Sequence, residues 1–228
     1  MEFYGFQKVT LLDYPGEVAS TLFTFGCNLR CPFCHNPQLI NADRRPDLIT
    51  WDEIYGYLVL RKNVLGGVVI SGGEPLMHSW ISEAVREIKN LGLKVKIDTN
   101  GFFPEMLEKL DPDYIAMDIK TSLKKYKLLG YSCESALSVK ESAGYIMKSG
   151  ISYEFRTTVV PGIVDDGDLE SITDMIAGAE KYSLAQFRPV NTLSADYESI
   201  TPYPQNKLEE MKEKASKKVR LCELRTNY

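Results

Sequence analysis

Long apolar runs, an export signal and an excess of positive charge are all missing from this sequence. No stretch approaches the ~18 apolar residues of a membrane-spanning helix. The N-terminal segment, MEFYGFQKVTLLDYPG, lacks the basic region and apolar core of a secretory signal peptide. The net charge of −4 provides no general attraction to phosphate backbones. The sequence therefore predicts a cytoplasmic protein whose partners include neither nucleic acid nor a membrane.

Cysteine is also scarce, but its distribution is uneven. Five cysteines in a chain without an export signal are poor evidence for disulfides. Cys27, Cys31 and Cys34 fall within one short segment, whereas Cys133 and Cys222 lie far from it in the sequence. This clustering favours a metal site.

Apolar segments typical of buried strands alternate with segments of helical periodicity. Thr50 followed by Glu53 predicts a capping box at the start of one helix. About six βα units are too few for a closed eightfold barrel, so we expect an α/β fold with an open, partial (βα)6 TIM-like barrel. No linker rich in Pro, Gly or Ser divides the chain, so residues 1–228 are expected to form a single domain. Strands are expected at 18–25, 67–70, 93–98, 114–119, 152–160, 184–190 and 219–224, and helices at 50–62, 80–91, 104–110, 135–148, 168–182 and 208–217.

Polar residues gather directly after three of the expected strands. These segments are Gly26–Asn36, Ser71–Pro75 and Asp98–Gly101. In parallel α/β folds the active site forms at the carboxyl ends of the strands. We therefore expect the three segments to contribute to one functional site.

The cysteine segment, GCNLRCPFCHN, is compatible with several metal groups. A [4Fe–4S] cluster is normally held by four thiolates, so three local ones would leave one iron open to another ligand. A structural zinc site needs a fourth ligand, for which His35, directly after Cys34, is awkwardly placed. The residues from Cys31 to His35 match the C-x-x-C-H pattern of covalent haem, which belongs to exported chains. A ferredoxin-like electron carrier would need a fourth nearby cysteine.

The C-x₃-C-x₂-C spacing, with an aromatic residue before the last cysteine, resembles the cluster motif of the radical S-adenosylmethionine (SAM) superfamily. The segment ISGGEP resembles the Gly-Gly-Glu motif of the same superfamily. Its glycines would let the backbone approach a ligand closely, and Glu74 offers an acceptor for an ammonium group. The resemblance implies a [4Fe–4S] cluster on Cys27, Cys31 and Cys34, contacts to the amino acid part of SAM from Gly72, Gly73 and Glu74, and a position near adenine for Phe33.

Further motifs extend the resemblance over nearly the whole chain. They are LDYPG at 12–16, DTNG at 98–101, MDIK at 117–120, RTTVVPG at 156–162 and TPYP at 201–204. With the cysteine segment they resemble the activating enzymes of glycyl radical proteins, related to pyruvate formate-lyase activating enzyme, and particularly the single-cluster type that activates anaerobic (class III) ribonucleoside-triphosphate reductase. The resemblance implies a glycyl radical enzyme as partner and flavodoxin or ferredoxin as electron donor. The eight-iron ferredoxin insert of larger activating enzymes is absent from the sequence.

Charged residues of these motifs are implied to bind SAM, a cation and the partner. Two carboxylates facing each other need a positive charge between them, and in this family a monovalent cation (Na⁺ or K⁺) fills such a place. A structural Asp–Lys or Asp–Arg network would satisfy the same carboxylates. Asp13 is implied to contact the loop around the partner's target glycine; an Asx-turn would explain it equally. The implied cation ligands are Asp98, Thr99 and Asp118, and the further SAM contacts are Asn100, Lys120, Arg156 and Asn191, the last in place of a family histidine.

Two other functions fit parts of the pattern. One is a small-molecule radical SAM enzyme such as a 7-carboxy-7-deazaguanine synthase, and the other is a zinc-stabilised binding module without enzymatic activity. SAM cleavage that requires a protein partner distinguishes an activating enzyme from the former. A brown colour that dithionite bleaches excludes the latter.

Overall fold

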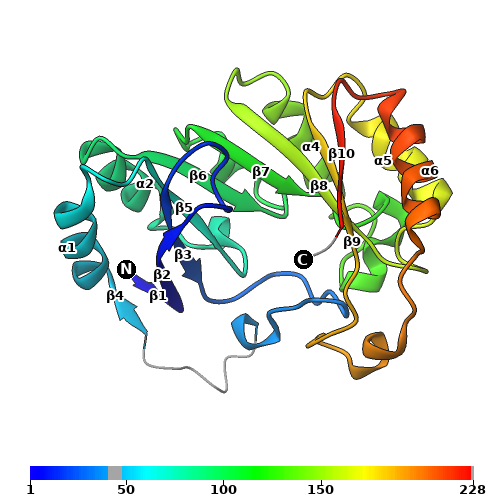
Figure 1. Cartoon of the computed structure of the whole chain (residues 1–228), viewed down its shortest axis with the longest axis horizontal. Coiled ribbons are helices and arrows are strands. Elements are labelled where there is room, and N and C mark those ends of the chain that lie inside the picture. Colours follow the sequence, from blue (N-terminus) through cyan, green and yellow to red (C-terminus); the bar gives the residue numbers. More distant parts are fainter. Residues whose placement is uncertain (41–47, 227–228) are drawn as a thin grey trace. The chain divides into compact units, whose positions relative to one another are not determined.

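The structure, a computed structural model, describes residues 1–40 and 48–226 and divides into two compact units. The first unit comprises Met1–Asn28, Gln38–Thr99 and Glu105–Ile115, and the second comprises Leu29–Pro37, Asn100–Pro104 and Ala116–Tyr228. Figure 1 follows the chain from its blue N-terminus to its red C-terminus. The expectation of a single domain over residues 1–228 stays a prediction.

The first unit contains a four-stranded part of the sheet in the order β6–β5–β3–β2. β3 pairs in parallel with β5, and β5 with β6, whereas β2 is antiparallel to β3. A separate antiparallel pair joins β1 to β4. Neither β2 nor this pair was expected from the sequence. The elements are β1 (Glu2–Phe3), β2 (Gly5–Thr10), β3 (Ala19–Thr24), β4 (Ile49–Thr50), α1 (Trp51–Arg61), β5 (Gly67–Gly72), α2 (Ile81–Asn90), β6 (Lys94–Thr99) and α3 (Pro104–Leu107).

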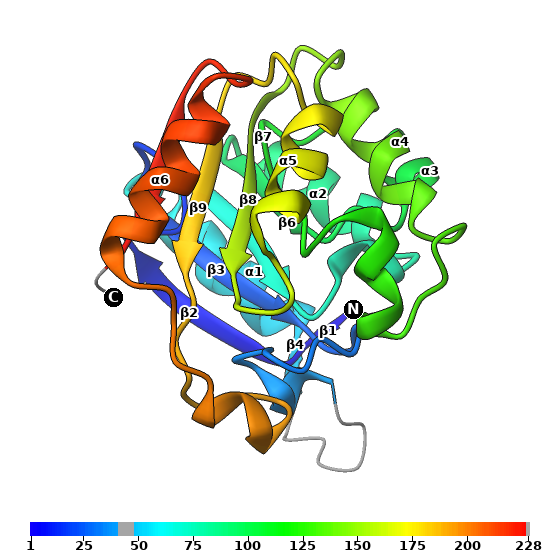
Figure 2. The same ribbon diagram turned by 90° about the vertical axis from the view of Figure 1, so that its right-hand side faces the viewer.

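The second unit contains β10, β9, β8 and the larger part of β7, which neighbour one another in the order β10–β9–β8–β7. β8 pairs in parallel with β9, and β9 with β10. Helix α6 packs against β10, β9 and α5, and Figure 2 shows α5 and α6 lying over β8 and β9. The elements are β7 (Tyr114–Asp118), α4 (Leu137–Ile146), β8 (Ser152–Val159), α5 (Asp166–Met175), β9 (Tyr182–Gln186), α6 (Gln205–Ser216) and β10 (Cys222–Arg225).

The mainly parallel sheet with intervening helices confirms the expected α/β class of partial TIM-barrel type. Parallel strands covered on both faces are apolar along their length, and β5 shows this, since Val68, Val69 and Ile70 are fully buried. Helix α2 buries Ile81 and Ile88, two turns apart on one face. Among the described residues, no helix combines the length and the apolar character needed to cross a membrane.

The helix expected at 168–182 was wrong at both ends. Asp165 is the N-cap of α5, and Asp168, whose side chain completes the capping box, is the third residue of the helix and not its first. The helix ends at Met175, and Gly178 turns the chain with a φ of 85°. Tyr182, expected to end the helix, is the first residue of β9.

The strand expected at 184–190 was also wrong, because β9 is shifted toward the N-terminus and ends at Gln186. Pro189 has no amide proton to donate to a strand ladder, and a proline restricts the residue before it. The segment from Arg188 onward is therefore a turn, in which the Val190 amide donates to the Arg188 carbonyl at 3.0 Å.

The capping box at Thr50 is confirmed and predicts a stability effect. The Thr50 hydroxyl accepts from the Glu53 amide, and the Glu53 carboxylate accepts from the Thr50 amide at 3.0 Å. Thr50→Ala should lower the free energy of unfolding by about 1 kcal/mol in urea denaturation, whereas Thr50→Ser should keep most of it. Equal stability of the wild type and the alanine variant would contradict this role.

Candidate functional site

The three cysteines lie in the segment that follows β3. Cys31 is buried, Cys27 and Cys34 are half-buried, and none of the three forms a disulfide in the part of the chain that the structure describes. The Cys34 amide donates to the Cys31 carbonyl at 3.0 Å, so these two residues share a tight turn. Cys27 belongs to the first unit, and Cys31 and Cys34 belong to the second. Within the described ranges, no three His, Cys, Asp or Glu side chains form a site for a single metal ion.

The Gly-Gly-Glu turn of the first unit is held against the backbone that leads into Cys27. The Glu74 amide donates to the Gly26 carbonyl at 2.8 Å. A Cβ atom on Gly73 would lie 1.8 Å from the Gly26 carbonyl oxygen, so only glycine allows this approach. Gly72 has a φ of 116°, which also favours glycine. Two motifs that are distant in the sequence are thus joined directly through their backbones.

The Glu74 side chain is fully buried and has a fixed orientation. Its Oε1 accepts from the Leu76 amide at 3.0 Å and from the Thr99 hydroxyl at 2.9 Å. These bonds satisfy a buried carboxylate that would otherwise be costly. The structure therefore brings Glu74, a predicted SAM residue, into contact with Thr99, a predicted cation ligand.

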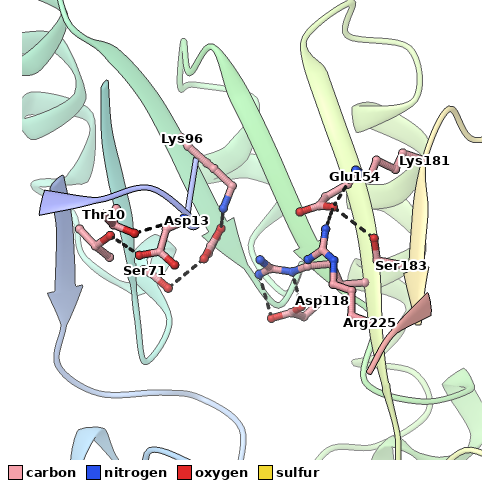
Figure 3. A network of polar contacts seen from close by, with 12 residues as sticks. Thr10, Asp13, Ser71, Lys96, Asp118, Glu154, Lys181, Ser183 and Arg225 are labelled. Carbon is pink, nitrogen blue, oxygen red and sulfur yellow. Dashed lines mark hydrogen bonds and ion pairs between the residues drawn. The ribbon is translucent and has the colours of Figure 1, made fainter. Parts of the chain in front are cut away.

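Asp98, a second predicted cation ligand, has a basic partner that sequence analysis missed. Its Oδ1 lies 2.5 Å from the Nζ of Lys96, and its Oδ2 accepts from the Ser71 hydroxyl at 3.0 Å (Figure 3). Only 2% of the Lys96 side chain is exposed. The sequence KVKIDT held a signal, because residues two apart in a strand lie on the same face.

Asp118, Lys120 and Arg156 form an ion-pair network in the second unit. Asp118 accepts from Arg156 Nε at 2.8 Å and from Lys120 Nζ at 3.1 Å. Burial alone would raise the pKa of Asp118, but the two positive charges outweigh it and hold that pKa well below its usual range. Burial opposes the charged form of Lys120, yet Asp118 and the nearby Cys31 raise its pKa above the usual value. Lys120 is thus electrostatically coupled to Cys31, a predicted cluster ligand.

Asp13 is held in the first unit by two threonines. Its Oδ2 accepts from the Thr21 hydroxyl at 2.8 Å, and its amide donates to the Thr10 hydroxyl at 3.3 Å. The neighbouring Leu12 side chain is 91% exposed. Asp13 therefore has a fixed carboxylate beside an exposed apolar residue.

The remaining predicted residues lie in the second unit. Phe33 is buried, with its ring centroid 6.4 Å from that of Tyr197. Asn100 is buried, and its side-chain oxygen accepts from the Phe102 amide at 3.2 Å. Asn191 is exposed and has a φ of 52°, a conformation that asparagine tolerates better than most residues. Their predicted roles toward SAM stay predictions.

A buried carboxylate of the second unit was not anticipated. Glu154 is 2% exposed and accepts from Arg225 at 2.5 Å and from Ser183 at 3.3 Å (Figure 3). Tyr126 is fully buried, and its hydroxyl accepts from the Lys120 amide at 3.2 Å. Glu154 and Arg156 are two residues apart in β8, so the sequence could have placed Glu154 on the same face of the strand as the predicted Arg156. No local pattern indicates that Tyr126 lies beside Lys120.

Comparison with known proteins finds similar sequences along the whole chain. The family model of the radical SAM superfamily matches residues 21–176. A Methanocaldococcus jannaschii protein assigned as a glycyl-radical enzyme activating enzyme is 32% identical and covers 97% of this chain and 95% of its own length. The pyruvate formate-lyase-activating enzyme of Listeria monocytogenes is 30% identical over 83% of this chain and 82% of its own.

Solved structures show a similar fold at low sequence identity. TYW1 with a lysine-pyruvate adduct has a TM-score of 0.63 and 16% identity, covering 87% of this chain and 73% of its own. SuiB of Streptococcus suis bound to S-adenosylmethionine has a TM-score of 0.65 and 18% identity, and the match covers 90% of this chain and 48% of SuiB. At these identities the similarity supports the fold alone.

The contact at Gly73 predicts a large cost for one added methyl group. Gly73→Ala should lower the free energy of unfolding by about 1–3 kcal/mol, because the new Cβ must displace the Gly26 carbonyl. Gly56→Ala is the matched control: Gly56 lies in α1, and the place that its added methyl group would take is open, so alanine should stabilise by up to about 1 kcal/mol. Urea denaturation measures both, and the same sign for the two variants would contradict the contact.

The lowered pKa of Asp118 predicts a pH-dependent contribution to stability. Asp118→Asn should cost about 2 kcal/mol near pH 7. Because the folded pKa lies below the unfolded value of about 3.9, this contribution is complete above the unfolded value and is lost as the pH falls toward the folded one. Urea denaturation of both proteins between pH 7 and pH 3 should show the difference shrinking at low pH. A difference independent of pH would contradict the ion-pair network.

Proposed function

This chain belongs to the radical SAM superfamily and, within it, to the glycyl-radical enzyme activating enzymes, and we propose that its partner is an anaerobic ribonucleoside-triphosphate reductase. It is therefore an oxidoreductase-class enzyme that uses a [4Fe–4S] cluster and SAM, and not a zinc-stabilised binding module. The assignment to the activating enzymes rests on the match to one of them along nearly the full length of both chains. The overall likeness of the sequence motifs to the single-cluster activating enzymes of that reductase supports it as partner.

We assign the cluster to Cys27, Cys31 and Cys34. Three cysteines in one short segment, none of them in a disulfide among the described residues, provide the soft thiolate donors that iron–sulfur clusters take, and they leave one iron for SAM. Three thiolates also bring negative charge into a partly buried place. Lys120, whose pKa the Cys31 charge raises, offers a compensating positive charge in the second unit.

We assign the carboxylate of SAM to the network of Asp118, Lys120 and Arg156, and its ammonium group to Glu74. Asp118 carries one negative charge against the two positive charges of Lys120 and Arg156, so this network retains one positive charge for a ligand carboxylate. Glu74 is held rigidly enough to accept a hydrogen bond from the ligand ammonium group. The other contacts that we assign to SAM come from Phe33, Gly72, Gly73, Asn100 and Asn191.

When bound and reduced, the cluster and SAM supply a 5′-deoxyadenosyl radical that removes a Cα hydrogen atom from a glycine of the partner. The chain's own residues hold the ligand in place and exclude water. Asp13, fixed by Thr10 and Thr21, is assigned to the backbone around the target glycine. We further propose a single domain, flavodoxin or ferredoxin as electron donor and a cytoplasmic location without nucleic acid or membrane as partner.

The proposal predicts a glycyl radical on one particular partner. The reconstituted protein is incubated anaerobically with SAM, a reductant and either an anaerobic ribonucleoside-triphosphate reductase or a pyruvate formate-lyase. An EPR doublet should appear on the reductase. A doublet on the lyase alone would show that the lyase, and not the reductase, is the partner. SAM cleavage coupled to a small molecule without any protein partner would overturn the activating role.

Cysteine variants provide the matched control for this experiment. Cys34→Ala should reduce the radical yield to background, because the cluster loses one of three ligands. Cys133→Ala removes an exposed thiol in another part of the chain and should change the yield less than about twofold. Equal losses in both variants would contradict the assigned cluster ligands.

A further inference from the structure

The monovalent cation implied by the family does not fit beside Asp98, because a positive side chain already lies there. The Lys96 ammonium is 2.5 Å from Asp98 Oδ1, and the Ser71 hydroxyl donates to Oδ2 at 3.0 Å. Only 2% of the Lys96 side chain is exposed, so its charge has almost no contact with solvent. Both carboxylate oxygens therefore have donors within the first unit.

Asp118, the other predicted cation ligand, is balanced within the second unit. Arg156 and Lys120 both donate to its carboxylate, at 2.8 Å and 3.1 Å. Two positive charges already exceed its single negative charge. Adding a metal ion here would increase an existing positive excess, which a partly buried site disfavours.

An ammonium group and a potassium ion have the same charge, and both are satisfied by oxygen atoms. The difference is that the ammonium is tethered to the chain and needs no uptake from solution. A metal ion close enough to Asp98 to be coordinated would also be close to Lys96, and the two like charges would repel each other strongly in a buried environment. The surroundings of Asp98 thus accommodate the Lys96 ammonium group and leave no place for a metal cation beside it.

We propose that Lys96 takes the place of the monovalent cation, so that this enzyme binds SAM without Na⁺ or K⁺. Lys96 is then a positioning residue, because it fixes Asp98, and Asp98 in turn binds Ser71 directly before the Gly-Gly-Glu turn. The effect on SAM rests on the proposed function. The effect on cation dependence does not, because it concerns only residues of this chain.

The test compares choline, sodium and potassium chloride at equal ionic strength. The reconstituted wild-type protein should have the same thermal unfolding midpoint and the same SAM dissociation constant in all three salts, within about twofold for the latter. Lys96→Met leaves Asp98 without its ammonium partner. In choline chloride this variant should bind SAM about tenfold more weakly and unfold at a lower temperature, and sodium or potassium should restore both in a saturable manner.

Two variants control for loss of a charge or of a lysine. Lys94→Met changes an exposed lysine of the same strand, paired with Glu17, and should show no alkali-metal dependence. Lys96→Met combined with Asp98→Asn removes both charges and should restore the midpoint without any response to sodium or potassium. The midpoints require neither SAM nor a partner, so they stay informative if no glycyl radical forms.

Two results would overturn the proposal. The first is a wild-type midpoint or SAM affinity that rises selectively with sodium or potassium, which decides the question even if Lys96→Met does not fold. The second is a folded Lys96→Met protein that responds to neither metal ion, because Lys96 would then be an ordinary ion-pair partner.

Discussion

The contact between the Gly-Gly-Glu turn and the Gly26 carbonyl is the constraint on which the site depends. Parallel pairing of β3 with β5 places Thr24 opposite Gly72, so the carboxyl ends of the two strands lie side by side at one edge of the sheet. The chain after β3 continues into the cysteines, and the chain after β5 continues into Glu74. Because Gly73 has no side chain, the two continuations lie close enough for a backbone hydrogen bond.

Charge balance is the second organising feature. The carboxylates of Asp98, Asp118 and Glu154 each lie beside a basic side chain of their own unit. Charges with little access to solvent are costly unless they are paired, so these basic partners offset the cost of burying or partly burying the three carboxylates. Their different surroundings determine what they can bind. The Asp98–Lys96 pair has no net charge, and both oxygens of Asp98 already accept hydrogen bonds. The network around Asp118 has two positive charges against one negative charge, which suits an anionic group.

Sequence alone predicted the fold class, because it depends on local patterns, and the same kind of pattern supplied the residues that we assign to the site. Strand–helix alternation gave the parallel sheet, and motif spacing identified the cysteines and the Gly-Gly-Glu turn. The capping box at Asp165 and the proline at 189 were also local signals, but they were overlooked, which misplaced α5 and β9. Strand periodicity could have revealed Lys96 in the same way.

Other features depend on contacts between residues that are distant in the sequence. No pattern near Tyr126 indicates that its hydroxyl accepts from the Lys120 amide, and none near Arg225 indicates Glu154 as its partner. The antiparallel strand β2 has the composition of a surface segment, with exposed Gln7 and Lys8, and only its pairing with β3 makes it a strand. Such contacts need the three-dimensional structure.

Mössbauer spectroscopy of the anaerobically reconstituted, ⁵⁷Fe-labelled protein tests the assignment of the cluster most directly. We expect a cluster of four irons in which adding SAM changes the signal of one iron, since three thiolates leave a single iron open. Four irons that do not respond to SAM, or a preparation that retains zinc instead of iron, would contradict the assignment.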